Sequence, residues 1–137
     1  MSNEFIKKLL KGLNKKLSTN FYSKEFDCSC DSCEQTIINM VHVARLEQLR
    51  RELDRPIKIT SGYRCADHNK AVGGVPSSQH MLGNATDILF LIKNEHDELR
   101  FKRIFPCVIA YDTFTHVDSR PGRKIFIDKR KKINTVN

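Results

Sequence analysis

The sequence predicts a single small α+β domain in which a long helix, over about residues 33–53, packs on one face of an antiparallel central sheet. Three observations lead to this prediction. The chain has 137 residues, which is enough for one domain with a modest core. Residues 33–53 carry apolar side chains at helical spacing, whereas the later segments are short β runs separated by turns. No internal repeat or low-complexity linker indicates a second domain.

The first segment is predicted to be a short amphipathic helix over residues 4–16, because Phe5, Leu9 and Leu13 recur at helical spacing with lysines between them. It would pack on the domain, or present a basic face to a membrane or a wall polymer. The basic segment after the last β run is expected to be loose at its end. The chain is thus divided into a basic amphipathic N-terminal helix, a main domain and a basic C-terminal tail: residues 1–16, 17–127 and 128–137.

The long helix is expected to begin after Ser32, because Ser32 and Gln35 have the spacing of a capping box. Pro56 ends it, since proline cannot continue the helical hydrogen bonds. Its predicted buried stripe consists of apolar residues on one helical face: Ile37, Met40, Val41, Ala44 and Leu49.

The later elements are short. The predicted strands are Ile57–Thr60, Ala85–Leu91, Cys107–Tyr111, Thr113–Ser119 and Lys124–Ile127. The predicted helices are one or two turns over residues 66–72, stopped by Gly73-Gly74, and a segment capped by Asn94 that runs to about Arg103.

The composition limits the classes of partner. Lysine and arginine outnumber aspartate and glutamate by 24 to 16, giving a formal charge of +8 that attracts polyanions in general. The chain has neither an RNA-binding aromatic signature nor zinc-finger spacing, so no specific nucleic-acid partner is expected. No membrane span is expected, because no stretch is long and apolar enough. The start lacks the features of a signal peptide, which predicts synthesis in the cytoplasm without an export signal.

The chain has five cysteines, an odd number that argues against a secreted disulfide framework. Cys28, Cys30 and Cys33 crowd one loop, while Cys65 and Cys107 lie alone. One interpretation is that all five are partly buried free thiols. The alternative is a structural zinc site in which the three clustered thiols act together with Cys65.

The most informative pattern consists of two histidines and a carboxylate at spacings that can close one metal site. Asp87 lies in an apolar strand, where a charge is costly unless it is paired or bound to a cation, although it could also cap a turn. His80 precedes it, and Gly83 between them can take the positive φ of a tight turn. His116 shares a strand face with Asp118. Three ligands and an open position are typical of a catalytic zinc, which we expect on the open face of the sheet, opposite the long helix.

Several segments of the chain, in a fixed order and with compatible gaps, resemble those of a known family. They are Leu17-Ser18-x-Asn20-Phe21, Glu25-Phe26-x-Cys28-x-Cys30, Ser61-Gly62-Tyr63-Arg64-Cys65, His68-Asn69, Val72-Gly73-Gly74, Ser78-x-His80-x2-Gly83-x-Ala85-x-Asp87 and Tyr111-Asp112-Thr113-Phe114-x-His116-Val117-Asp118. The family they resemble is zinc peptidase family M15, and within it subfamily A. The family contains D-Ala-D-Ala carboxypeptidases and L-alanyl-D-glutamate endopeptidases of bacterial peptidoglycan and is related to the hedgehog signalling domain.

The resemblance implies that one zinc ion is held by three ligands: His80, Asp87 and His116. It also implies that Arg64 holds a substrate carboxylate or carbonyl, which suits the fork of a guanidinium. Three further side chains would line the same pocket: Ser61, Tyr63 and Ser78.

The general base is left open between two residues. Many members of the family place an acid three residues before the last ligand, where this chain has Thr113. Asp112 lies in a turn from which it can swing toward the metal, and we prefer it. Asp118 is the second candidate, and it could instead orient His116. Phe114 stands where some members have a histidine.

The expected reaction is hydrolysis of a peptide bond, in which zinc lowers the pKa of a bound water, an aspartate takes the proton and Arg64 helps to stabilise the oxyanion. We therefore expect a monomeric zinc metallopeptidase acting on peptidoglycan at the bacterial cell wall, which fits a phage lysis protein or virion component. Two alternatives remain: a catalytically impaired, zinc-containing cell-wall or protein binding module, and a basic nucleic-acid-associated protein with a structural metal.

Overall fold

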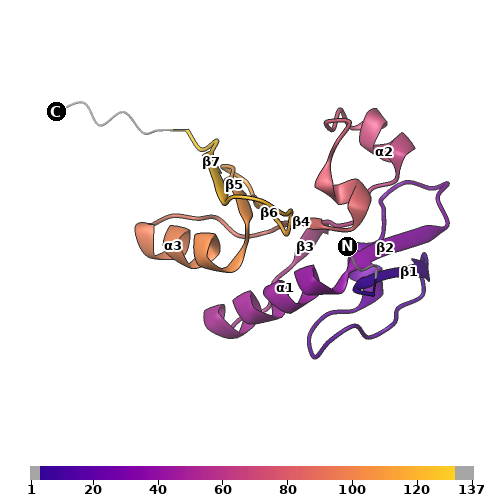
Figure 1. Ribbon diagram of the computed structural model, residues 1–137, viewed down its shortest axis with the longest axis horizontal. Helices are drawn as coiled ribbons and strands as arrows, with labels where there is room; N and C mark the ends of the chain where they lie inside the picture. The colour runs from indigo at the N-terminus through magenta and orange to yellow at the C-terminus, as the bar shows by residue number, and fades with distance from the viewer. Residues whose placement is uncertain (1–3, 132–137) are drawn as a thin grey trace.

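The computed structural model describes residues 4–131 and has an α+β architecture (Figure 1). The strands are β1 (Ile6–Leu10), β2 (Gln35–Asn39), β3 (Ile59–Ser61), β4 (Ala85–Ile88), β5 (Cys107–Ala110), β6 (Thr115–Asp118) and β7 (Ile125–Asp128). The helices are α1 (Met40–Leu53), α2 (Ala66–Ala71) and α3 (Glu95–Ile104), with short 3-10 turns η1 (Ser23–Phe26) and η2 (Gln79–Leu82). None of the helices within residues 4–131 is both long and apolar enough to cross a bilayer.

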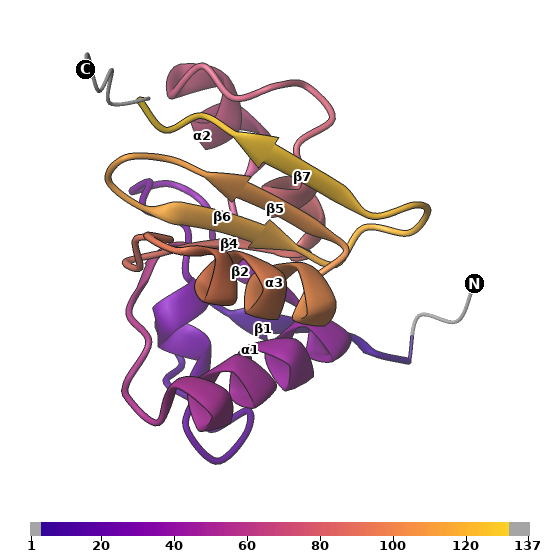
Figure 2. The same cartoon turned by 90° about the vertical axis from the view of Figure 1, so that its left-hand side faces the viewer.

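The main sheet has five strands in the order β3-β4-β6-β5-β7. Its first three pairings are antiparallel, as the sequence predicts, but β7 runs parallel to β5. This corrects the expectation of a wholly antiparallel sheet. The chain reverses after β6 and crosses to the free edge of β5, so β7 takes the direction of β5 (Figure 2).

The N-terminal segment is a strand and not the predicted helix. Within the described part of residues 4–16, β1 pairs antiparallel with β2 to form a small second sheet. The β-branched run Thr36-Ile37-Ile38 favours an extended β2. Pairing with β1 gives the backbone groups along one edge of β2 their hydrogen-bond partners. Residues 1–3 of the expected helix, like residues 132–137 of the expected tail, lie outside the described residues.

The long helix begins later than predicted, at Met40, because β2 occupies the preceding residues. Asn39, and not Ser32, caps it by accepting a hydrogen bond from the Val41 amide. It ends at Leu53, with Asp54 as its C-cap, before the proline, as predicted. This later start changes which side chains are buried, and the helix places these residues inward: His42, Val43, Leu46, Glu47 and Leu49.

The core lies between the main sheet and helices α1 and α3, which contact each other. The cap of α3 by Asn94 is confirmed, since its side chain accepts a hydrogen bond from the Asp97 amide at 2.8 Å. Thr86 and Ile88 of β4 and Val117 of β6 are buried on this side of the sheet. Since side chains alternate along a strand, the intervening residues of β4 and β6 face the opposite side, toward which α2 lies (Figure 1).

Candidate metal centre

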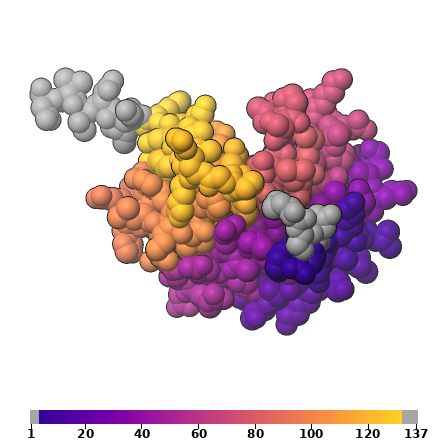
Figure 3. Space-filling model, in the orientation of Figure 1, coloured from indigo at the N-terminus to yellow at the C-terminus, as the bar shows by residue number. Residues whose placement is uncertain are grey.

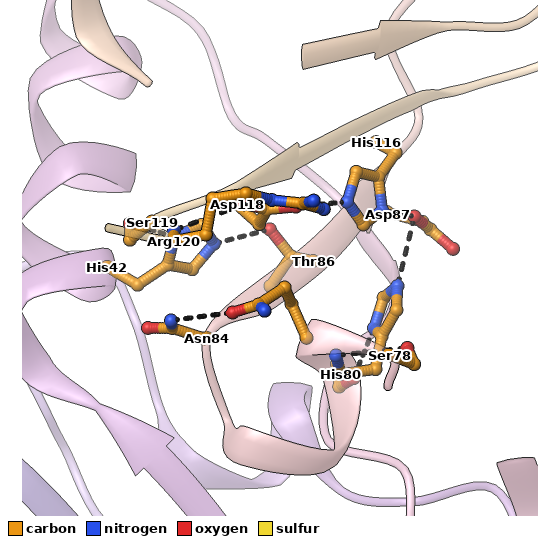
Figure 4. Close-up of polar contacts among 12 residues, drawn as sticks. His42, Ser78, His80, Asn84, Thr86, Asp87, His116, Asp118, Ser119 and Arg120 are labelled. Carbon is orange, nitrogen blue, oxygen red and sulfur yellow. Dashed lines mark hydrogen bonds and ion pairs between the residues drawn. The ribbon is translucent and has the colours of Figure 1, made fainter. Parts of the chain in front are cut away.

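Three potential metal ligands converge on the face of the sheet opposite α1 and α3 (Figure 4). Asp87 of β4 is directly opposite His116 of β6 in the antiparallel register, and His80 approaches from η2. The Oδ1 atom of Asp87 lies 3.0 Å from His116 Nδ1 and 3.3 Å from His80 Nε2. Zinc binds such ligands at about 2.0–2.2 Å, so two donors of a tetrahedral site lie roughly 3.3 Å apart. The spacing and chemistry of the three donors fit a zinc ion.

His80 is held so that one ring nitrogen faces the centre. Its Nδ1 lies 2.7 Å from the carbonyl oxygen of Gly62, to which it donates, and this leaves the Nε2 lone pair for a metal. Its amide donates to the Ser78 hydroxyl, and its carbonyl accepts from the Arg64 amide. Gly83 ends the turn at φ 71°, and a Cβ there would overlap the Ile37 backbone, so the turn requires the glycine that was predicted to allow it.

His116 is held in the same way by a carboxylate. Its Nε2 lies 2.7 Å from Oδ2 of Asp118, a residue with no exposed surface. Arg120 donates to the same carboxylate from its backbone amide and from two guanidinium nitrogens. Asp118 therefore accepts the Nε2 proton and leaves Nδ1 of His116 facing Asp87. Arg120 was not singled out from the sequence, and the only available signal was its position two residues after a candidate acid.

The charges of the centre shift the ionisation of its members. Burial alone would lower the pKa of His116, but the carboxylates of Asp118 and Asp87 raise it above its ordinary value. Burial opposes ionisation of Asp87, yet hydrogen bonds from His116 and His80 hold the pKa of this carboxyl well below its usual range.

The three ligands line a cleft with a volume of about 390 Å³. Figure 3 shows a hollow between the α2 segment and the lobe formed by β5 and β7. The cleft is lined by Arg64, Gly73, Gly74, Val75, Ser77, Ser78, Gln79, His80, Asp87, Ile109, Tyr111, Phe114, His116 and Arg120. Arg64 and Ser78 thus line the same cleft as the three candidate ligands, while Ser61 and Tyr63 are absent from the described residues that line it. Tyr63 is buried, and Ser61 pairs with Asp87 in the sheet.

Arg64 is positioned at the cleft wall by a small polar network. Its Nη1 donates to Oδ1 of Asn69 at 3.1 Å, and the side-chain amide of Asn69 donates to the Val75 carbonyl at 2.9 Å. A Cβ on Gly74 would overlap Oδ1 of Asn69 and lie 2.8 Å from Nη1 of Arg64. Gly74 therefore leaves space for the side chains of Arg64 and Asn69, a role that was not expected when Gly73-Gly74 was interpreted as a helix stop.

Asp112 does not join the centre. It is exposed in the turn between β5 and β6, and its carboxylate accepts hydrogen bonds from the Lys131 amide at 3.0 and 3.2 Å. It lines a separate hollow together with Asp128 and Arg130. The chain after β7 returns to this turn and holds the side chain away from the metal ligands, so the structure brings Asp118, and not Asp112, next to His116.

His42 is a third buried histidine, and it supports the centre from behind. Its Nε2 lies 3.0 Å from the Thr86 hydroxyl and its Nδ1 lies 2.7 Å from the Ser119 hydroxyl. Burial lowers the pKa of this imidazole to about 3, so it stays neutral. Its ring therefore fixes α1 to the strands that carry the ligands without adding a charge to the centre.

Comparison with known proteins agrees with this geometry. The family model described as Peptidase M15 matches residues 19–118, a range that contains all three candidate ligands and Arg64. No match is found among curated proteins. Zinc-dependent peptidases make up this family, so the match indicates a zinc metallopeptidase. Because the matched range covers well over half of the chain, the protein belongs to the M15 peptidase family.

Proposed function

We propose that this protein is a zinc metallopeptidase that hydrolyses peptide bonds in the stem peptides or cross-links of bacterial peptidoglycan. Its reaction would be that of the enzymes of subfamily A, either a D-Ala-D-Ala carboxypeptidase or an L-Ala-D-Glu-type endopeptidase. One observation carries the proposal. Two imidazoles and a carboxylate converge at the floor of a cleft, and the second nitrogen of each imidazole already has a hydrogen-bond acceptor.

Each residue of the centre has a separate task. A zinc ion held by His80, Asp87 and His116 would supply an activated water and polarise the scissile carbonyl. Asp118 keeps the proton of His116 on Nε2 and stabilises positive charge on the ring. The Gly62 carbonyl keeps the proton of His80 on Nδ1 and leaves Nε2 for the metal.

Arg64 supports a substrate that carries carboxylates. Asn69 accepts from one of its guanidinium N–H groups, and a guanidinium has five, so donors remain for a ligand in the cleft. Stem peptides of peptidoglycan carry free carboxylates, which a guanidinium binds in bidentate fashion. The formal charge of +8 also favours association with an anionic cell wall, where we place the action of this protein, as a phage lysis protein or virion component.

A second candidate function is a binding module that keeps zinc but does not hydrolyse the peptide. It is favoured by the cleft itself, because Asp87 is the one carboxylate among the described residues that line it. Asp118 lies behind His116, and Asp112 is held by the Lys131 amide. A separate carboxylate base next to the metal is therefore missing from the described part of the cleft.

The deciding experiment is digestion of purified peptidoglycan with zinc-loaded protein, with the products identified by mass. The His80→Ala variant is the control, because it removes one ligand and leaves the rest of the cleft in place. New stem fragments from the wild type alone would establish the peptidase and name the bond. Intact peptidoglycan that is nevertheless bound by the zinc-loaded wild type would replace the enzyme with the binding module.

A further inference from the structure

The structure brings together four cysteines at a distance from the candidate metal centre. Cys28, Cys30 and Cys33 come from the loop between η1 and β2, and Cys65 lies at the start of α2. Their four Sγ atoms all lie within 4.8 Å of one another. None of the four is in a disulfide, and the fifth cysteine, Cys107, is buried in β5 outside the cluster.

The spacing of the sulfur atoms fits one tetrahedral metal ion. Zinc–sulfur bonds are about 2.3 Å long, so two sulfurs of a tetrahedral site lie roughly 3.8 Å apart. In the structure Cys65 Sγ is 3.8 Å from Cys28 Sγ and 3.7 Å from Cys30 Sγ. Four thiolates complete the shell and leave no position for water, which is typical of a structural site and not of a catalytic one.

The surroundings of the sulfurs supply hydrogen-bond donors and positive charge. Backbone amides of Cys33, Cys65 and His68 donate to the sulfurs of Cys30, Cys28 and Cys65 at 3.4–3.5 Å. Nζ of Lys11 lies 3.7 Å from both Cys30 Sγ and Cys33 Sγ, and it also donates to the Cys30 carbonyl. Four thiolates and one divalent cation carry a net charge of −2, which these donors partly offset.

We infer that Cys28, Cys30, Cys33 and Cys65 bind one structural zinc ion as a closed tetrathiolate site. A tetrahedral set of four sulfurs selects zinc or iron among the common metals, and the absence of an open position suits zinc as a structural ion. The assignment does not depend on the peptidase activity, because it uses none of the three candidate catalytic ligands.

This site would fasten the loop of residues 28–33 to the segment that carries the substrate arginine. Cys65 directly follows Arg64, and the Gly62 carbonyl accepts from His80. The same segment is held to the loop by a hydrogen bond from the Tyr63 amide to the Phe26 carbonyl at 2.8 Å. Gly62 packs so tightly here that a Cβ would lie 2.6 Å from Phe26 Cα. A zinc ion bound by both segments would add to these contacts and stabilise the loop, which is too short to bury a core of its own.

The test uses the full chain carrying His80→Ala, which weakens the candidate catalytic centre and leaves the cysteines intact. Purified under reducing conditions, this variant should retain one zinc per chain. X-ray absorption at the zinc edge should show a first shell of sulfur at about 2.3 Å. Absence of bound metal, a shell of nitrogen and oxygen, iron in place of zinc, or disulfides among these cysteines would overturn the inference.

Matched variants locate the ion. Adding Cys30→Ala to His80→Ala should remove the remaining zinc, whereas adding Cys107→Ala should leave it in place. If the double variant with Cys30→Ala does not fold, X-ray absorption of the His80→Ala protein still tests the inference, because this protein keeps all four thiols. If the wild-type protein has no peptidase activity but contains a sulfur-bound zinc, the proposed function is rejected and the structural zinc site is upheld.

Discussion

Replacing Asp118 by asparagine tests how the carboxylate behind His116 prepares the metal centre. Oδ2 of Asp118 accepts from His116 Nε2 at 2.7 Å and from Arg120 Nη2 at 2.6 Å, while Oδ1 accepts from the Arg120 amide and Nε. An asparagine of the same shape has one acceptor oxygen in place of two. Its NH2 group must therefore face either His116 and Arg120 Nη2 or two other donors of Arg120.

The first orientation moves the His116 proton to Nδ1, the atom that faces Asp87, and the second leaves two donors of Arg120 opposed by another donor. Loss of such a partner of a metal-bound histidine weakens metal binding by about 10–100-fold. We expect the zinc dissociation constant of Asp118→Asn to rise by this factor, or about 1.4–2.7 kcal/mol. The free energy of unfolding of the metal-free protein should fall by about 1.5–3 kcal/mol, the value of a hydrogen bond to a charged group.

The assay is competition for zinc against a chromophoric chelator at neutral pH, with urea unfolding of the metal-free protein beside it. Asp112→Asn is the matched control, because it makes the same chemical change on an exposed side chain outside the cleft. The control should bind zinc like the wild type and change the unfolding free energy by less than about 0.5 kcal/mol. Equal zinc affinity in wild type and Asp118→Asn, or an equal loss in the control, would refute the reasoning.

Three further predictions concern pH, the arginine network and the core. The pKa of His116 is higher in the folded protein than in the unfolded chain, so it stabilises the fold below about pH 6.5, and this stability is lost as the pH rises through the folded pKa. The pKa of Asp87 is lower in the folded protein, so it stabilises the fold above about pH 4, and this stability is lost in acid. The lowered pKa of His42, about 3, removes stability as the pH falls below about 6.5, because only the unfolded imidazole then takes up a proton. Urea unfolding with a chelator present should therefore find the metal-free protein most stable near pH 6.5, and a maximum below about pH 5 or in alkali would contradict this. Gly74→Ala should displace the Arg64 side chain and weaken binding of a stem peptide in calorimetry while zinc content stays unchanged; unchanged peptide affinity would remove Arg64 from the substrate site. Leu46→Ala should lower the free energy of unfolding by about 2–5 kcal/mol because Leu46 is fully buried, against less than about 0.5 kcal/mol for the exposed Leu99→Ala.

The elements that the sequence predicts well are those specified by local chemistry. Asn94 caps α3 as expected, and Gly83 takes the positive φ that its position required. The alternation in β4 buries Thr86 and Ile88 and turns Asp87 to the other face, because a strand has a period of two.

The failures all involve partners that are distant in the sequence. The apolar residues of the N-terminal segment satisfy a helical period, but pairing with β2 decides their conformation. The parallel edge strand β7 depends on which edge of the sheet is free after β5 and β6 have paired. Asp112 illustrates the same limit within the site, since the Lys131 amide, 19 residues later in the chain, fixes where its carboxylate points.

The three ligands of the metal centre differ in how firmly the backbone holds them. Asp87 and His116 lie on paired strands, whereas His80 lies on a short turn. These two ligands are neighbours in one antiparallel ladder, so their separation is set by backbone hydrogen bonds. A slip of either strand by one residue would turn the ligand on that strand into the core. His80, in contrast, stands on a single 3-10 turn closed by a glycine. We expect metal exchange to begin with outward movement of this turn, while the two ligands on the sheet keep their geometry until the next ion binds.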